Sequence, residues 1–63
     1  MDNKRWFTTA EAAAYLSVAV HAVRDAVWSG HLPYVRAGKR FIFDRTDLDG
    51  WAEARKVREP GLS

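Results

Sequence analysis

The spacing of apolar and polar residues divides the chain into three predicted helices and one hairpin. In the first predicted helix, residues 8–15, apolar side chains recur every three or four residues, as on a helix face that packs on a core. The residues expected on that face are Ala12, Tyr15 and Leu16. The second predicted helix, residues 20–29, repeats the pattern with Val23, Ala26 and Val27. Only a short turn at 17–19 separates the two, so we expect them to pack against each other.

Capping residues indicate where the helices begin and end. Thr8 and Glu11 have the spacing of a capping box, in which each side chain bonds a backbone N–H of the first turn. Gly30 follows the second helix as a C-cap signal, and Pro33 prevents its continuation. Asp44 is placed to cap a third helix. The buried face expected for that helix consists of Leu48, Trp51 and Ala52.

Between the second and third helices, alternation indicates a two-stranded hairpin within residues 34–43. Phe41 and Phe43 fall on the same face of the second strand. The turn is expected at residues 37–39, where Gly38 can adopt a positive φ. The predicted fold is therefore mainly α with a small β-hairpin: a winged helix-turn-helix of three helices plus a two-stranded wing.

Length and composition are consistent with one small domain. The 63 residues are expected to form a single domain, 1–63, with an ordered core at about 6–55 and a flexible tail at 56–63. The absence of cysteine excludes disulfide bridges and thiolate metal sites. No apolar run approaches the ~18 residues of a membrane span, so we expect a cytoplasmic protein that makes no membrane contact.

Positive charge is concentrated in the second predicted helix and the hairpin. The formal net charge of the chain is only +2. Residues 21–45 nevertheless contain five basic and two acidic residues, whereas the remainder contains five basic and six acidic ones. This uneven distribution points to a nucleic-acid partner, and the alternative is a solvated basic surface.

In their order and spacing, these segments resemble the excisionase and MerR-like winged helix-turn-helix family. The resemblance covers about residues 7–54 and rests on four stretches in this order: TTAEAAAYLSV (8–18), SGHLP (29–33), RAGKR (36–40) and DRTDL (44–48) followed by Trp51. Two departures concern the helix-turn-helix itself. Ser17 replaces the usual turn glycine, and Ala19 stands where a Ser or Thr often caps the recognition helix.

The resemblance implies one of two related functions. The first is a phage excisionase, or recombination directionality factor, which binds double-stranded DNA cooperatively beside an attachment site, bends it and directs integrase toward excision. Its partners would be DNA, an integrase (a tyrosine or serine recombinase) and neighbouring copies of itself along the DNA. The alternative is a small MerR-like transcriptional regulator. Since MerR-type regulators usually append a dimerising helix and an effector domain, the short chain favours the excisionase.

The residues expected to contact DNA lie on the second helix and the hairpin. A recognition helix enters the major groove with its outward face, where an arginine can donate two hydrogen bonds to guanine. The outward residues of this helix are Val20, His21, Arg24, Asp25 and Trp28. The candidates on the wing are Arg36, Lys39 and Arg40, and Arg45 in the third helix is a further candidate.

Two other function classes fit the sequence less well. Asp44 and Asp47 have the positions of helix-cap residues rather than of an acid–base pair, and no metal-ligand set is spaced around His21 or His31. We therefore expect no enzyme, cofactor or metal site. A protein-binding adaptor stays open because Val20 and Trp28 are apolar, and salt-sensitive DNA binding would distinguish the two.

Overall fold

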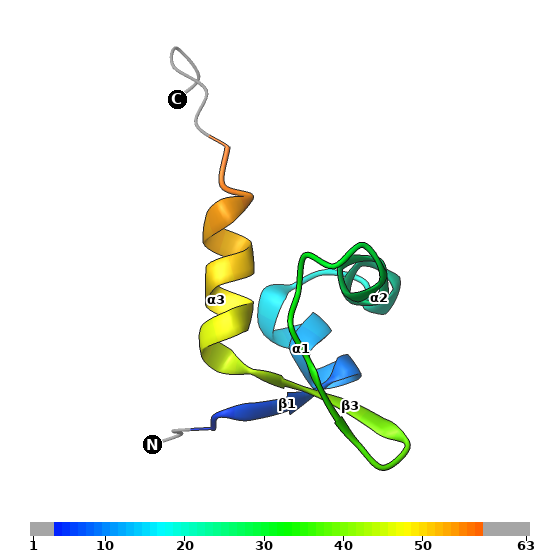
Figure 1. Ribbon diagram of the computed structural model, residues 1–63. Coiled ribbons are helices and arrows are strands. Elements are labelled where there is room, and N and C mark those ends of the chain that lie inside the picture. The colour runs from blue at the N-terminus through cyan, green and yellow to red at the C-terminus, as the bar shows by residue number, and fades with distance from the viewer. Residues whose placement is uncertain (1–3, 58–63) are drawn as a thin grey trace.

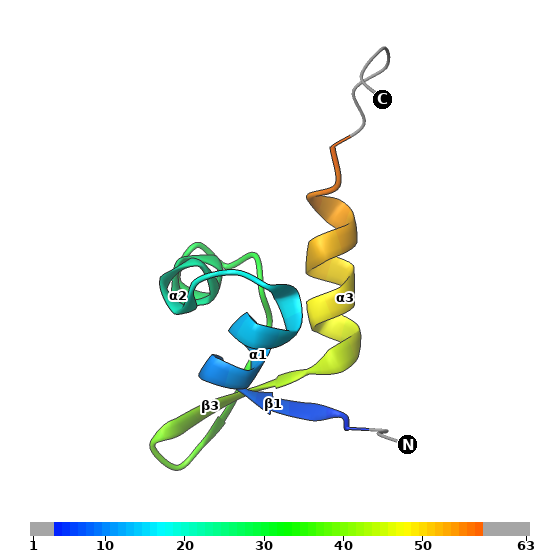
Figure 2. The same ribbon diagram turned by 180° about the vertical axis from the view of Figure 1, so that it is seen from behind.

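The computed structural model describes residues 4–57, which form three helices and one three-stranded antiparallel sheet. The elements in chain order are β1 (Trp6–Thr8), α1 (Thr9–Leu16), α2 (Val20–Trp28), β2 (Val35–Ala37), β3 (Arg40–Asp44) and α3 (Arg45–Ala54). β3 is the central strand, and β1 and β2 flank it. Figure 1 and Figure 2 show α1 between α2 and α3, with the hairpin of β2 and β3 projecting below α2. Within residues 4–57, no helix has the length and apolar character needed to cross a membrane.

This architecture is a small winged helix-turn-helix, as predicted, with one strand more than expected. In β1, Trp6, Phe7 and Thr8 pair antiparallel with residues of β3. A three-residue strand is too short for alternation to reveal it, and only its pairing partner defines it. Of the flexible tail expected at 56–63, residues 58–63 lie outside the described residues.

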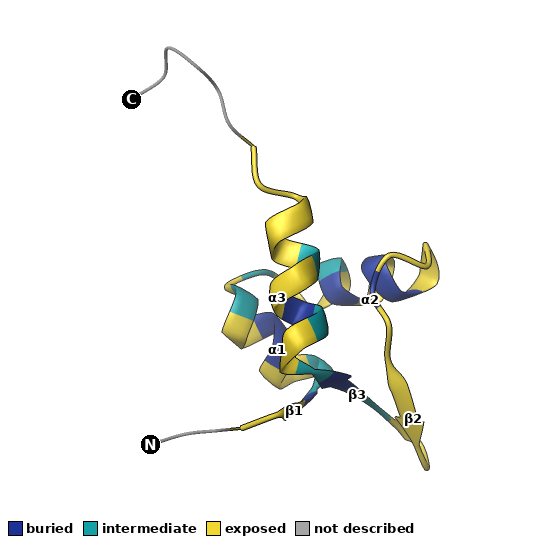
Figure 3. Cartoon of the chain, turned by 60° about the vertical axis from the view of Figure 1, so that its left-hand side comes forward, coloured by how far each residue is buried: buried dark blue, intermediate teal, exposed yellow. Residues whose placement is uncertain are grey.

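The core lies where α1, α2 and α3 meet the central strand (Figure 3). Its buried residues are Phe7, Ala12, Ala13, Val23, Ala26, Val27, Leu32, Phe43 and Leu48. The inward stripe predicted for α2 is confirmed, and so is the burial of Ala12 and Leu48. Small side chains on α1 allow α2 to approach closely, which leaves the core with few large residues.

Two residues predicted to be buried are exposed. Tyr15 is 44% exposed, because α1 turns Ala12 and Ala13 toward the core and leaves Tyr15 at the edge. Its ring lies 5.0 Å from that of Phe7, and its hydroxyl donates a 2.6 Å hydrogen bond to Asp49 of α3. Ala52 is exposed because α3 packs on the core through its first half, and the contact ends near Trp51.

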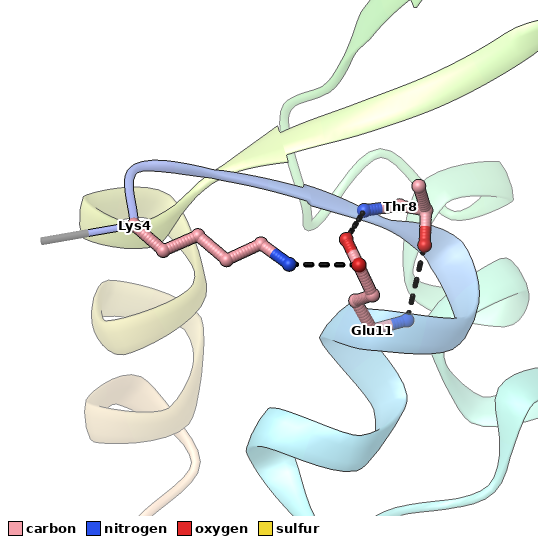
Figure 4. Close-up of polar contacts among 3 residues, drawn as sticks. All are labelled: Lys4, Thr8 and Glu11. Carbon is pink, nitrogen blue, oxygen red and sulfur yellow. Dashed lines mark hydrogen bonds and ion pairs between the residues drawn. The ribbon is translucent and has the colours of Figure 1, made fainter. Parts of the chain in front are cut away.

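The first turn of α1 contains the predicted capping box (Figure 4). The Glu11 amide donates to Thr8 Oγ1 (3.2 Å), and the Thr8 amide donates to Glu11 Oε1 (3.0 Å). Lys4 Nζ adds an ion pair to Glu11 Oε2 at 2.7 Å. Lys4 and the Thr8 amide, in that order, lower the pKa of Glu11 below its usual value. The start of α1 is thus fixed against the N-terminal segment.

α1 ends in a hydrogen-bonded C-cap that contains one residue in the left-handed backbone conformation. The Val18 amide donates to the Ala13 carbonyl (2.9 Å), and the Ser17 amide donates to that of Ala14 (3.2 Å). This is the Schellman pattern, in which the first residue after the helix has a positive φ. Ser17 has a φ of 59°.

α2 ends in the same way, at the predicted glycine. The His31 amide donates to the Ala26 carbonyl (2.9 Å), and the Gly30 amide donates to that of Val27 (3.1 Å). Gly30 has a φ of 78°, which suits a residue without a Cβ. The two stops set the directions in which the chain leaves α1 and α2.

Candidate nucleic-acid interface

A hollow of about 570 Å³ lies between α2 and the hairpin. Val27 and Phe43 of the core reach its surface from within, and the first turn of α1 borders it. In both Figure 1 and Figure 2, α2 and the hairpin lie on the same side of the molecule, away from α3. The two elements expected to touch DNA therefore share one surface. We call this surface the groove side, and it comprises α2, the β2–β3 hairpin and the hollow between them.

The charge of the hollow is entirely positive. Arg24 approaches from α2, and Lys39 and Arg40 approach from the hairpin, whereas no carboxylate residue lines the hollow. Within residues 4–57, none of these three cations forms an ion pair. Because their charges are not neutralised by the protein, they are available to an anionic ligand such as a phosphate.

Outside the hollow, three cations of the described residues form ion pairs, whereas Arg36, Arg45 and Arg55 form none. Lys4 pairs with Glu11, Arg5 with Asp44 (3.1 Å) and Lys56 with Glu53 (2.9 Å). All three pairs involve the N-terminal segment or α3. The hollow is thus distinguished by bringing three cations without a carboxylate partner to one place.

The five outward residues predicted on α2 are all exposed, and they divide into two sets. Val20, Arg24 and Trp28 line the hollow, and Trp28 is 79% exposed. His21 and Asp25 do not line it. Successive helical residues are rotated by about 100°, so these two share the face next to the hollow, turned away from the hairpin.

The start of α2 has no side-chain cap. Its N-cap residue, Ala19, has an extended backbone and forms no capping hydrogen bond through its side chain. This is the structural consequence of the departure from the family pattern at that position. The first turn of the recognition helix also has no acidic residue, so no carboxylate opposes the approach of DNA there.

The hairpin turn is tighter than predicted. Ala37 pairs with Arg40, so the loop contains only Gly38 and Lys39. Gly38 has a φ of 63°, which a two-residue turn requires at its first position. The turn holds Lys39 and Arg40 at the tip, next to each other and on the edge of the hollow.

The two other predicted cations lie outside the hollow. The Arg36 guanidinium is 6.0 Å from the centre of the Phe41 ring, in the range of a cation–π contact. Arg45 is exposed in the first turn of α3, the helix farthest from α2 in Figure 1 and Figure 2. The structure therefore brings together only part of the predicted set.

Sequence reasoning missed the contribution of α1 to this surface. Thr9 and Ala10, in the first turn of α1, border the hollow beside the hairpin. The capping box correctly predicts where α1 begins, but not what lies next to it. That proximity depends on the pairing of β1 with β3, which has no signal in the sequence pattern.

Comparison with known proteins agrees with this geometry. Residues 6–56 match the family model described as a helix-turn-helix domain. Searches of curated proteins and of solved structures gave no match. The match spans β1 to the end of α3 and includes every element that forms the hollow. The chain belongs to the helix-turn-helix domain family and is a sequence-specific DNA-binding domain.

Proposed function

We propose that this chain is an architectural DNA-binding protein of the excisionase type. It would bind repeated sites beside a phage attachment site, bend the DNA and help integrase assemble the excision complex in the cytoplasm of a bacterial host. The family that matches the chain includes excisionase-like proteins, which supports the proposal. The proposal gives the chain no catalytic step, and the chemistry of strand exchange belongs to the integrase.

The observation that carries the proposal is the small hollow, whose charged lining residues are all cationic. Three cations would neutralise about three phosphates, which corresponds to a slope of log K against log[salt] of about −2.7. A single module of this size buries about 600–1,000 Å² on DNA, and non-specific binding of such proteins is in the range of ~10⁻⁴–10⁻⁶ M. One copy would bind weakly, so useful occupancy calls for several copies on adjacent sites.

Bending leads to the same requirement. Bending a 20–30 bp site by 40–90° costs about 1–6 kcal/mol. A cost at the upper end of this range would use most of the about 5–8 kcal/mol that a single weakly bound domain gains on binding, whereas several copies on adjacent sites can share it. This function would therefore depend on self-association along the DNA.

The test combines binding with recombination. Wild-type protein is titrated onto attachment-site DNA in a gel-shift assay and then added to an in vitro excision reaction with an integrase that recombines that attachment site. We expect a steep transition with several shifted bands, and excision products only when the protein is present. The variant Lys39→Ala/Arg40→Ala is expected to lose both effects.

A MerR-like regulator would give a different result. It would bind a promoter and change transcription from it, with no effect on excision by the integrase. That outcome would reject the excisionase role while retaining DNA binding.

A further inference from the structure

We propose that Trp28 of one copy of this chain inserts into a depression beside α3 of the next copy, and that this contact joins copies bound side by side on DNA. The proposal rests on the self-association that the proposed function requires, and it identifies the two surfaces that form it. One surface is the end of α2 around Trp28. The other is the α3 depression, a hollow of about 440 Å³ whose lining includes His31, Pro33, Gly50, Trp51, Ala54 and Arg55.

Trp28 is the most exposed large hydrophobic side chain among the described residues, with 79% of its surface open to solvent. A tryptophan that packs against a partner buries about 150–250 Å² of surface, so this exposure leaves a large hydrophobic gain unused. Trp28 is also the last residue of α2. Recognition helices contact bases mainly with their N-terminal residues, so the C-terminal end of α2 is left for another partner.

Gly50 is the feature of α3 that indicates where such a partner packs. It lies inside the helix, and a glycine there destabilises a helix relative to alanine. Gly50 has no positive φ, and a Cβ added to it would meet no atom of the described residues within 4 Å. The domain itself therefore gives no reason for a glycine at this position. A side chain from another molecule that packs against the bare backbone of α3 would give one.

The lining of the α3 depression suits an indole ring. Trp51 and Pro33 supply apolar surfaces, and the small residues Gly50 and Ala54 lie one helical turn apart on α3. Aromatic rings attract each other in offset-stacked and edge-to-face arrangements, so Trp51 is a favourable neighbour for a second indole. The volume of the depression also lies within the about 300–1,000 Å³ of sites that enclose a small molecule.

The charges around the two surfaces are complementary. Arg24 and Asp25 lie one turn before Trp28 on α2, and Asp47 and Arg55 line the α3 depression. Neither Asp25 nor Arg55 forms an ion pair within residues 4–57. Each surface thus offers one charge of each sign, and the Asp25 carboxylate can pair with the Arg55 guanidinium of the next copy.

The two surfaces lie on different sides of the molecule. Trp28 lines the hollow of the groove side, whereas the depression lies against α3, away from the hairpin in Figure 1 and Figure 2. A contact between two different surfaces leaves one of each free at the ends of a row, so that further copies can be added.

The small size of the contact ties it to DNA. One inserted tryptophan buries far less than the about 1,200–2,000 Å² of a stable interface. The contact would therefore form only where adjacent sites on one duplex raise the effective concentration of the two copies. We expect a monomer in free solution and cooperative binding on DNA.

The test measures cooperativity separately from DNA affinity. Wild-type protein selects its site from a randomised duplex library, and duplexes are then made with one site or with two sites in direct repeat at several spacings. The cooperativity factor is the affinity for the second site divided by that for the first. Trp28→Ala is expected to lower this factor about tenfold or more and to keep the single-site affinity within about twofold of the wild type. Trp6→Ala removes a tryptophan that is exposed elsewhere and is the matched control, with an unchanged factor.

A second variant fills the α3 depression. Gly50→Leu is expected to lower the cooperativity factor as much as Trp28→Ala does. Because leucine is a better helix former than glycine, its melting temperature should be no lower than that of the wild type. Ala52→Leu introduces the same side chain at an exposed position of α3 outside the depression, and its cooperativity factor should stay at the wild-type value. In an equimolar mixture, the Trp28→Ala protein supplies an intact depression and the Gly50→Leu protein an intact Trp28, so part of the cooperativity should return.

Three results would overturn the proposal. The first is a Trp28→Ala protein with weaker single-site binding and an unchanged cooperativity factor, which would assign Trp28 to DNA. The second is an equal loss of cooperativity with Ala52→Leu and Gly50→Leu. The third is a mixture no more cooperative than either variant alone.

The proposed function fails on different results. None of these measurements uses integrase or attachment-site DNA, so a failed excision reaction would reject the excisionase role and leave the contact between copies in place. A wild-type cooperativity factor near one would reject self-association itself, and with it both proposals.

Discussion

The groove side of the molecule and the opposite side, around α3, differ in the ion pairing of their cations. On the α3 side, which comprises residues 4–7, α3 and its N-cap residue Asp44, ion pairs join Lys4 to Glu11 of α1 and Arg5 to Asp44. On the groove side, the three cations of the hollow form no ion pair within the described residues. The ion pairs of the α3 side thus fix the N-terminal segment and the helix starts, whereas the cations of the hollow, like Arg45 and Arg55, have no carboxylate partner within the described residues.

The distribution of side-chain bonds follows the same division. Asp44 accepts from the Thr46 amide (3.0 Å) and from the Arg5 guanidinium, and these contacts lower the pKa of Asp44. α2 has no comparable side-chain cap at its start. Substitutions on the α3 side should therefore change stability, whereas those on the groove side should change binding.

The largest effect is expected from Leu48→Ala on the α3 side. Leu48 is fully buried, and such a truncation costs about 2–5 kcal/mol. A domain this small has a stability of only about 3–5 kcal/mol, so a large fraction of the variant should be unfolded in a thermal melt followed by circular dichroism. Trp28→Ala removes a larger but exposed side chain and serves as the control. Equal losses of melting temperature would contradict the comparison.

The next effect is on binding. Lys39→Ala/Arg40→Ala should reduce the salt slope by about 1.8 and weaken binding to any duplex about 30-fold at 0.15 M salt. Its melting temperature should stay near that of the wild type, because neither side chain is buried. The matched variant Arg5→Ala/Lys56→Ala removes two cations that are paired within the protein. If it flattened the slope as much, pairing would not distinguish the two sides.

Much of this comparison could be predicted from sequence, because its main signals are local. The capping box at Thr8, the stop at Gly30 and the inward stripe of α2 depend on residues within a few positions of one another, and the structure contains all three. The clustering of cations in the hairpin is also visible along the chain. A local signal is sufficient where the interaction itself is local.

What could not be predicted depends on contacts between distant segments. β1 is a strand only because β3 lies beside it, and the exposure of Tyr15 follows from the rotation of α1 on the core. The division of Arg24 from Asp25 required the position of the hairpin relative to α2. Helical spacing alone places both on the outward face.

A smaller effect on stability is expected from Thr8→Ala. The substitution removes the acceptor of the Glu11 amide, and loss of such a cap costs about 1 kcal/mol. Chemical denaturation should measure it as a lower midpoint with an unchanged slope. Thr9→Ala, one residue into the same helix, is the control and should change stability by less than about 0.5 kcal/mol. A loss at Thr9 equal to that at Thr8 would argue against the capping box as the cause.

The smallest effect is the pH dependence of stability. Glu11 and Asp44 have pKa values lowered in the folded protein, so the unfolded chain binds more protons near pH 4. Their contribution is present above the unfolded pKa and is lost as the pH falls through the folded one. The melting temperature should thus decline modestly below about pH 4, and Asp44→Asn should make that decline shallower. An Asp44→Asn profile as steep as the wild type would exclude a role for this carboxylate.

A comparison of the C-terminal ends of α1 and α2 shows one position at which a substitution could raise the thermal stability of the domain. The chain uses glycine at the left-handed residue after α2 but serine at the corresponding residue after α1. A residue with a Cβ pays about 1–2 kcal/mol for that conformation, whereas the greater freedom of glycine in the unfolded chain costs about 0.5–1 kcal/mol. Ser17→Gly should therefore yield a sturdier protein by up to about 1 kcal/mol while leaving every residue of the hollow as it is. The turn between α1 and α2 is therefore a position where protein engineering could increase thermal stability without changing the residues that line the hollow.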